Sequence, residues 1–130
     1  MIARADARYP AALEDHLPPE QLWCLGNVEL LAATPMVAIV GTRNCTAYGE
    51  RTARGLAAAV ARAGGCVVSG MARGVDAAAH RGALEVGGRT IAVLGTGVDV
   101  PYPASHRALH REIAARGLVI SEMPPGQAAF

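Results

Sequence analysis

The chain contains no lysine, and all 12 of its basic residues are arginine. Aromatic residues make up only 4% of the 130 positions, and the formal net charge is +1. This balance excludes a globally basic surface, so an anion-binding surface has to come from local clustering of arginine. The absence of lysine also excludes a Walker A phosphate-binding loop. Arginine suits phosphate because its guanidinium is a planar fork, but a GC-rich genome is the reason we favour for its exclusive use.

Cysteine and long apolar runs are also scarce. The three cysteines, Cys24, Cys45 and Cys66, are odd in number and include no C-x-x-C pair, which argues against a disulfide framework and against a zinc site. No apolar run approaches the roughly 20 residues of a membrane span, and the first residues lack the apolar core of a signal peptide. We therefore expect a cytoplasmic protein with no metal site and no membrane contact.

Short apolar runs rich in valine and isoleucine alternate with helical patterns from Met36 onward. The runs do not alternate with polar residues, which predicts strands covered on both faces. The strand candidates are 36–40, 66–68, 90–94 and 118–120, and the helix candidates are 47–63, 76–86 and 104–116. The order βαβαβαβ predicts a mainly parallel sheet with helices on both faces. The fold class is therefore α/β, as a Rossmann-like three-layer α/β/α domain.

Residues 1–35 form a different kind of segment. Prolines at positions 10, 18 and 19 exclude a long helix there. Leu22 to Gly26 is a candidate short strand, and residues 28–33 are a candidate for one or two helical turns. We expect residues 1–35 to be a lead-in that packs on a Rossmann-like domain over residues 36–130.

Two glycine-containing loops predict an anion-binding crevice. Ser69-Gly70-Met71-Ala72-Arg73-Gly74-Val75-Asp76 follows one apolar run, and Gly41-Thr42-Arg43 follows another. A strand that ends in such a loop and then starts a helix directs backbone amides and a helix N-terminus at an anion. Ligands of open α/β sheets bind outside the carboxyl ends of the strands, so both loops face one crevice. The predicted phosphate-binding residues are Gly41, Thr42, Arg43, Ser69, Gly70, Arg73 and Gly74.

Different roles are expected within this set. Arg43 and Arg73 are predicted ligand contacts, because an arginine in a glycine-containing loop contributes little to packing. The Ser69 hydroxyl is expected to bind phosphate or to cap its loop, and Asp76 to be the N-cap of the following helix. The arginines on helices are interpreted as surface charges. These are Arg51, Arg54, Arg81, Arg107 and Arg111.

No catalytic residue emerges from the remaining motifs. Gly95-Thr96-Gly97 begins like a dinucleotide fingerprint, but it lacks the third glycine, and Pro101 stands where a helix should start. Asp76 and His80 share a helix face, and we interpret them as a cap and a packed histidine rather than a metal pair. Ser69 lacks the G-x-S-x-G elbow of a hydrolase. The sequence predicts no enzyme activity and no cofactor.

Several segments together resemble the DNA processing protein A family (DprA, also called Smf). They are Ile39-Val40-Gly41-Thr42-Arg43, Tyr48-Gly49, Val68 to Asp76, Ala79-His80, Gly82-Ala83-Leu84, Gly88 to Leu94, Asp99, Tyr102-Pro103 and Ile120-Ser121-Glu122. The resemblance covers nearly the whole chain in order. It implies an extended Rossmann fold that binds single-stranded DNA during natural transformation, loads the RecA recombinase and has no established catalytic activity. It places Arg43 and Arg73 in the DNA pocket, and His106 where the family usually has asparagine.

The same resemblance implies that the domain is incomplete, since family members continue into further strands of the sheet. The strand at 118–120 is then expected to be an exposed edge or the neighbour of an outside segment, which favours self-association as a homodimer. The alternative is that residues 1–35 cover this region and leave a monomer. Two alternative functions also stay open, a nucleotide-binding module and a phosphoribohydrolase-like enzyme. The second is weakened because residues 95–99 lack the paired glycines and the glutamate of those enzymes.

Overall fold

The computed structural model describes residues 1–15 and 17–129. Its strands are β1 (Ile2–Ala3), β2 (Gln21–Gly26), β3 (Met36–Ala38), β4 (Cys66–Ser69), β5 (Arg89–Leu94) and β6 (Leu118–Ser121). Its α-helices are α1 (Ala47–Arg62), α2 (Val75–Glu85) and α3 (Arg107–Arg116), and its 3-10 helices are η1 (Ala11–Asp15), η2 (Val28–Ala32) and η3 (Ala104–His106). Each strand and helix predicted from Met36 onward is present. In the described part of the chain, no helix is both long and apolar enough to span a membrane.

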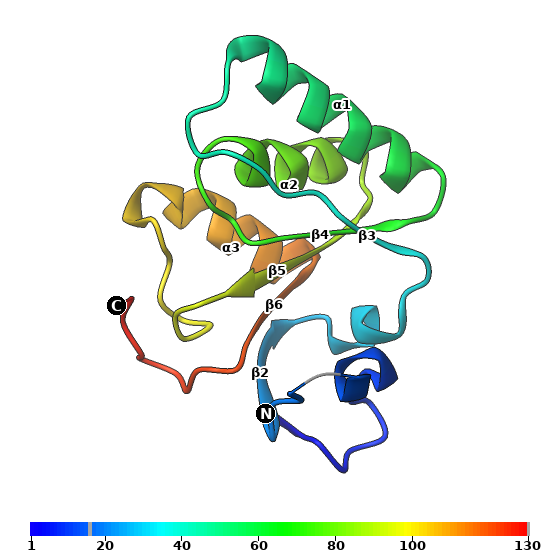
Figure 1. The fold of residues 1–130 in the computed structure, drawn as a ribbon, viewed down its shortest axis with the longest axis vertical. Coiled ribbons are helices and arrows are strands. Elements are labelled where there is room, and N and C mark those ends of the chain that lie inside the picture. The colour runs from blue at the N-terminus through cyan, green and yellow to red at the C-terminus, as the bar shows by residue number, and fades with distance from the viewer. Residues whose placement is uncertain (16, 130) are drawn as a thin grey trace.

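One six-stranded sheet has the order β1-β2-β6-β5-β4-β3. Strands β3 to β6 are parallel neighbours in chain order, and β2 joins β6 antiparallel. The predicted α/β class with a mainly parallel sheet is confirmed. Because all crossovers run in one direction along the sheet and are right-handed, α1, α2 and α3 share one face (Figure 1).

Alternate strand residues face the two sides of the sheet. On the helical side, Ala92 and Val119 pack with Leu84 and Ile113 of the helices. On the other side, Ile91 and Leu118 pack with apolar residues of the lead-in, among them Leu22, Leu30 and Leu31. The third layer is therefore built by the N-terminal segment and its 3-10 helices, and the prediction of α-helices on both faces is wrong.

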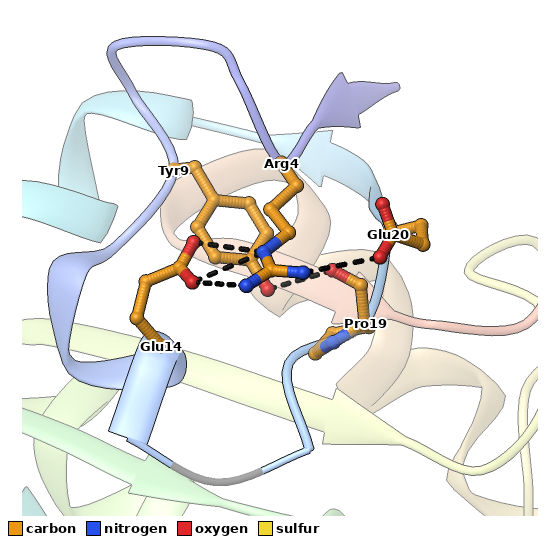
Figure 2. A network of polar contacts seen from close by, with 5 residues as sticks. All are labelled: Arg4, Tyr9, Glu14, Pro19 and Glu20. Atoms are coloured by element: carbon orange, nitrogen blue, oxygen red, sulfur yellow. Dashed lines mark hydrogen bonds and ion pairs between the residues drawn. The ribbon is translucent and has the colours of Figure 1, made fainter.

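A polar network holds the lead-in together (Figure 2). The Arg4 guanidinium donates to both carboxylate oxygens of Glu14, the shortest contact being 2.7 Å, and to Glu20 at 3.2 Å. The Tyr9 hydroxyl donates to the Pro19 carbonyl at 2.7 Å. These bonds join the residues after β1 to η1 and to the residues just before β2, so they hold the lead-in together as a folded unit.

The lead-in covers the last strand, which was the alternative prediction to an exposed edge. Strand β6 was expected as an edge or as the neighbour of an outside segment, but it lies between β2 and β5 with all four residues buried. The lead-in supplies its neighbour, because Trp23 to Gly26 pair with Leu118 to Ser121. In the described residues the edge on the opposite side is β3, which pairs only with β4 and has exposed side chains throughout.

Candidate anion-binding site

Both predicted loops lie at the carboxyl ends of adjacent parallel strands. The first runs from the end of β3 to α1, whose N-cap Thr46 accepts a hydrogen bond from the Gly49 amide at 3.0 Å. The second, Gly70 to Gly74, joins β4 to α2. Since β3 and β4 are hydrogen-bonded neighbours, the loops meet as the sequence predicted.

The carboxylate of Asp76 bridges the two loops. It is 7% exposed and accepts hydrogen bonds from the Gly41 amide at 3.3 Å and the Gly70 amide at 3.0 Å. Its predicted role as N-cap is wrong, because the N-cap of α2 is Gly74 and Asp76 lies inside the first turn. The reason is geometric, since Gly74 turns the chain with a φ of 79° and places Asp76 over the strand ends. The Asp76 carboxylate thus occupies the Gly41 and Gly70 amides, which were predicted to bind a ligand.

Gly74 sits where the loops touch. A Cβ atom there would lie 2.3 Å from the Thr42 carbonyl oxygen and 2.9 Å from that of Arg43. The Thr42 carbonyl also accepts from the Val75 amide at 3.2 Å, and its hydroxyl accepts from the Asn44 amide at 3.2 Å. Gly74 and Thr42 therefore shape the site by packing the second loop onto the first.

The Ser69 hydroxyl has an internal partner. It is 3% exposed and donates to the Ile39 carbonyl at 2.6 Å. Gly41 is close-packed as well, since a Cβ there would lie 2.9 Å from a methyl group of Val75. These two residues join β3 to β4 and to the start of α2, which leaves Arg43, Gly70 and Arg73 as the predicted residues that face the crevice.

A pocket of about 410 Å³ lies at this edge of the sheet. Arg43 and Arg73 reach it from the first two loops, and Gly95 and Thr96 reach it from the end of β5. Tyr102, which is 51% exposed, supplies an aromatic wall beside Pro103. Among the described residues, neither Arg43 nor Arg73 has a carboxylate within ion-pair distance. Both guanidinium groups are exposed and available to an external anion.

Met71 and His106 fix the second loop in ways the sequence did not reveal. Met71 is fully buried against α2 and α3 and has a positive φ of 61°, unusual for a residue other than glycine. The His106 Nδ1 donates to its carbonyl at 2.8 Å, which ties η3 to the loop. Because the Met71 side chain points into the core, Arg73 lies on the exposed side of the same loop. A positive φ at methionine has no signature in the sequence.

His80 is a packed histidine, as predicted. Its Nδ1 lies 2.7 Å from the Thr90 hydroxyl, which itself donates to the Val67 carbonyl at 2.9 Å. The ring therefore donates from Nδ1, and Nε2 is buried without a hydrogen-bond partner among the described residues. Burial lowers the pKa of His80 to about 4, although the charge of Asp76 opposes that shift. Within residues 1–15 and 17–129, no cluster of three metal-ligating side chains occurs.

The fold and pocket define a Rossmann-like α/β domain with a pocket lined by two arginines at the carboxyl edge of its sheet. The segment after β5 does not start a helix until η3, so Gly95-Thr96-Gly97 is no dinucleotide fingerprint. The chain belongs to the family described as DNA recombination-mediator protein A, whose profile matches residues 1–130. The predicted family is thereby confirmed.

Relatives and solved structures agree with this assignment. The chain is 51% identical over 109 residues to a DNA processing protein DprA of Mycobacterium tuberculosis, covering 83% of this chain and 28% of that protein. The X-ray structure of DprA from Streptococcus pneumoniae superposes with a TM-score of 0.92 at 37% identity, over 99% of this chain and 45% of that one. A structure of Helicobacter pylori DprA, described by its single-stranded DNA binding mode, superposes with a TM-score of 0.84 at 36% identity. The match covers 93% of this chain and 55% of that one. The chain thus spans about half or less of these proteins.

Proposed function

We propose that this domain binds single-stranded DNA as a DNA-processing module of the DprA/Smf type. The observation that carries the proposal is the pair of exposed arginines, Arg43 and Arg73, which line one pocket and have no carboxylate partner in the described residues. The family match and the likeness to a DprA studied for single-stranded DNA binding support it.

The recognition would be carried by side chains rather than by amides. Asp76 already occupies the Gly41 and Gly70 amides, so phosphates are left to the two guanidinium groups. Tyr102 offers an exposed ring at the pocket wall, on which a base can stack without regard to sequence. Small residues at the strand ends allow the nucleotide backbone to approach. This arrangement predicts salt-sensitive binding with little sequence preference.

We propose binding without turnover. Two acid–base side chains beside the lining residues already have structural partners, Asp76 with the Gly41 and Gly70 amides and His106 with the Met71 carbonyl. A nucleotide-binding module is the alternative in which the same pocket holds a mononucleotide, and a phosphoribohydrolase-like enzyme is a further one. Titration with oligo(dT) and with AMP separates these functions. Preferred binding of oligo(dT), with AMP left unhydrolysed, is expected, whereas tight binding or turnover of AMP would overturn the proposal.

On the basis of the resemblance, we propose that this domain shares the roles of the longer family members. In that context the module would take part in natural transformation and in loading RecA. We also propose a cytoplasmic location, in keeping with three free cysteines in the described residues. Residues 1–35 would serve as a cover for the sheet, and residues 36–130 would carry the DNA site.

A homodimer is proposed through β3, which is one of the two edge strands of the sheet in the described residues. Met36 and Val37 are exposed on it, and Val40 just beyond it is 68% exposed. An exposed apolar edge favours pairing with a second copy. Light scattering at micromolar concentration is expected to give twice the chain mass, and a monomer mass would reject this contact.

A further inference from the structure

The arginines without ion-pair partners are unevenly distributed over the molecule. Arg4, Arg8, Arg54 and Arg116 pair with carboxylates, and Arg89 donates to a backbone carbonyl. The arginines for which the described residues provide no such partner are Arg43, Arg51, Arg62, Arg73, Arg81, Arg107 and Arg111. Five of these seven lie in the two loops or within the first five residues of α1 and α3, which start at the pocket edge of the sheet.

Helix α3 shows this uneven distribution of arginines most clearly. Arg107 is its first residue and Arg111 lies one turn later, and both are exposed. Residues four apart share a helix face and are separated by about 6 Å along the axis. At the far end of the helix, Arg116 is neutralised by Glu112 at 2.7 Å. A cation at a helix N-terminus opposes the helix dipole, so Arg107 does not serve the stability of α3.

The chain leads directly from the pocket to these two arginines. Tyr102 and Pro103 line the pocket, η3 follows at once, and α3 starts at Arg107. The hydrogen bond from His106 to the Met71 carbonyl fixes η3 to the loop that carries Arg73. The exposed carboxylates that follow β5 and β6, Asp99 and Glu122, form no ion pair with Arg107 or Arg111. The loop that carries Arg73 is therefore linked through η3 to the start of α3.

We propose that Arg107 and Arg111 form a second phosphate-binding segment, onto which a DNA strand passes after leaving the pocket. The inference rests on the proposed function of the pocket and adds the direction of the strand. A short oligonucleotide fills the pocket and contacts Arg43 and Arg73. A longer one also reaches α3, whose two arginines are spaced to meet successive phosphates of an extended strand. Single-stranded DNA is the expected ligand because the segment continues from the pocket for which single-stranded DNA is proposed.

The test compares an oligo(dT) tetramer with a dodecamer by fluorescence anisotropy over a range of salt concentrations. The parent is measured beside Arg107→Ala/Arg111→Ala and a control of equal charge, Arg62→Ala/Arg81→Ala. The first double variant should leave tetramer affinity unchanged and weaken dodecamer affinity roughly 2- to 25-fold at low salt, as expected for two exposed ion pairs. The log–log salt slope for the dodecamer should fall in magnitude by about 1.4. The control should bind both as the parent does.

Three outcomes would overturn the inference. Parent-like affinity and slope for the dodecamer would show that α3 makes no phosphate contact. An equal loss for both lengths would place the two arginines in the pocket or in the fold rather than along the strand path. A parent that binds neither length would reject the function of the pocket itself. Circular dichroism and melting temperatures identify a variant that has lost its fold, and Arg107→Gln/Arg111→Gln then replaces it.

Discussion

The carboxylate of Asp76 lies 3.0 Å from the amide nitrogen of Gly70 and accepts its hydrogen bond. The same carboxylate accepts from Gly41 at 3.3 Å, so one side chain at the start of α2 holds the ends of β3 and β4 together. Backbone amides of this kind commonly bind phosphate in α/β folds. Here they are satisfied from within, which makes Asp76 a structural anion and leaves ligand recognition to the loop arginines.

Replacing Asp76 should therefore destabilise the fold before it affects any ligand. Asp76→Ala leaves two partly buried amides without their acceptor and should lower the free energy of unfolding by about 3 kcal/mol, since bonds to charged groups contribute about 1.5–3 kcal/mol. Urea unfolding measures this. Formate or acetate should restore part of the loss by occupying the vacated amides.

The control for this variant is Asp99→Ala. Asp99 is an exposed carboxylate that accepts from the Gly126 amide at 2.7 Å, outside the junction of the two loops. The Asp99→Ala substitution should cost little stability, and carboxylate anions should not restore any of the loss. Equal losses for both variants, or no response of Asp76→Ala to formate, would contradict the structural role assigned to Asp76.

Gly74 should tolerate no side chain. Gly74→Ala combines a positive φ of 79° with a Cβ only 2.3 Å from the Thr42 carbonyl oxygen, so the two loops must separate. We expect a loss of at least about 2 kcal/mol in unfolding free energy. Gly55→Ala is the matched variant, because Gly55 lies inside α1 with no neighbour near its Cβ position. It should gain up to about 1 kcal/mol. A melting temperature that changes in the same direction for Gly74→Ala and Gly55→Ala would refute this contrast.

Stability should fall as the pH drops through the titration of His80. Burial lowers the pKa of this histidine from 6.5 to about 4, so protonation favours the unfolded chain. The contribution is complete above about pH 6.5 and is lost as the pH falls toward 4. A shift of this size corresponds to about 3 kcal/mol.

Thermal melts of the parent and of His80→Gln between these pH values test this expectation. The variant should have a flatter pH profile, whatever its stability at neutral pH, because it lacks the group that titrates. Asp6 and Glu14 have lowered pKa values from their arginine partners, so their effects fall at lower pH and are common to both proteins. Parallel profiles for the two proteins would exclude His80 as the cause.

The regular elements followed from local patterns, and the site followed only in part. Non-alternating valine and isoleucine runs predicted β4, β5 and β6 because parallel strands are covered on both faces. Cover of β6 by the lead-in was predicted only as an alternative, and the pairing with β2 was not predicted, because a contact between residues almost 100 positions apart leaves no local periodicity. Glycine and arginine marked the two loops, while the inward turn of Met71 and the bridging carboxylate of Asp76 depend on tertiary packing. Ser69 illustrates the limit, since its hydroxyl suited a phosphate in sequence and bonds the Ile39 carbonyl in the fold.

The central claim is that Arg43 and Arg73 together bind the phosphates of single-stranded DNA. The most direct measurement is the affinity of Arg43→Ala/Arg73→Ala for an oligo(dT) tetramer as a function of salt, beside the parent and Arg62→Ala/Arg81→Ala. The account predicts a loss of roughly 5- to 150-fold at low salt, and a log–log slope reduced in magnitude by about 1.4, with an unchanged melting temperature. A folded double variant that binds the tetramer with the affinity and salt slope of the parent would contradict it.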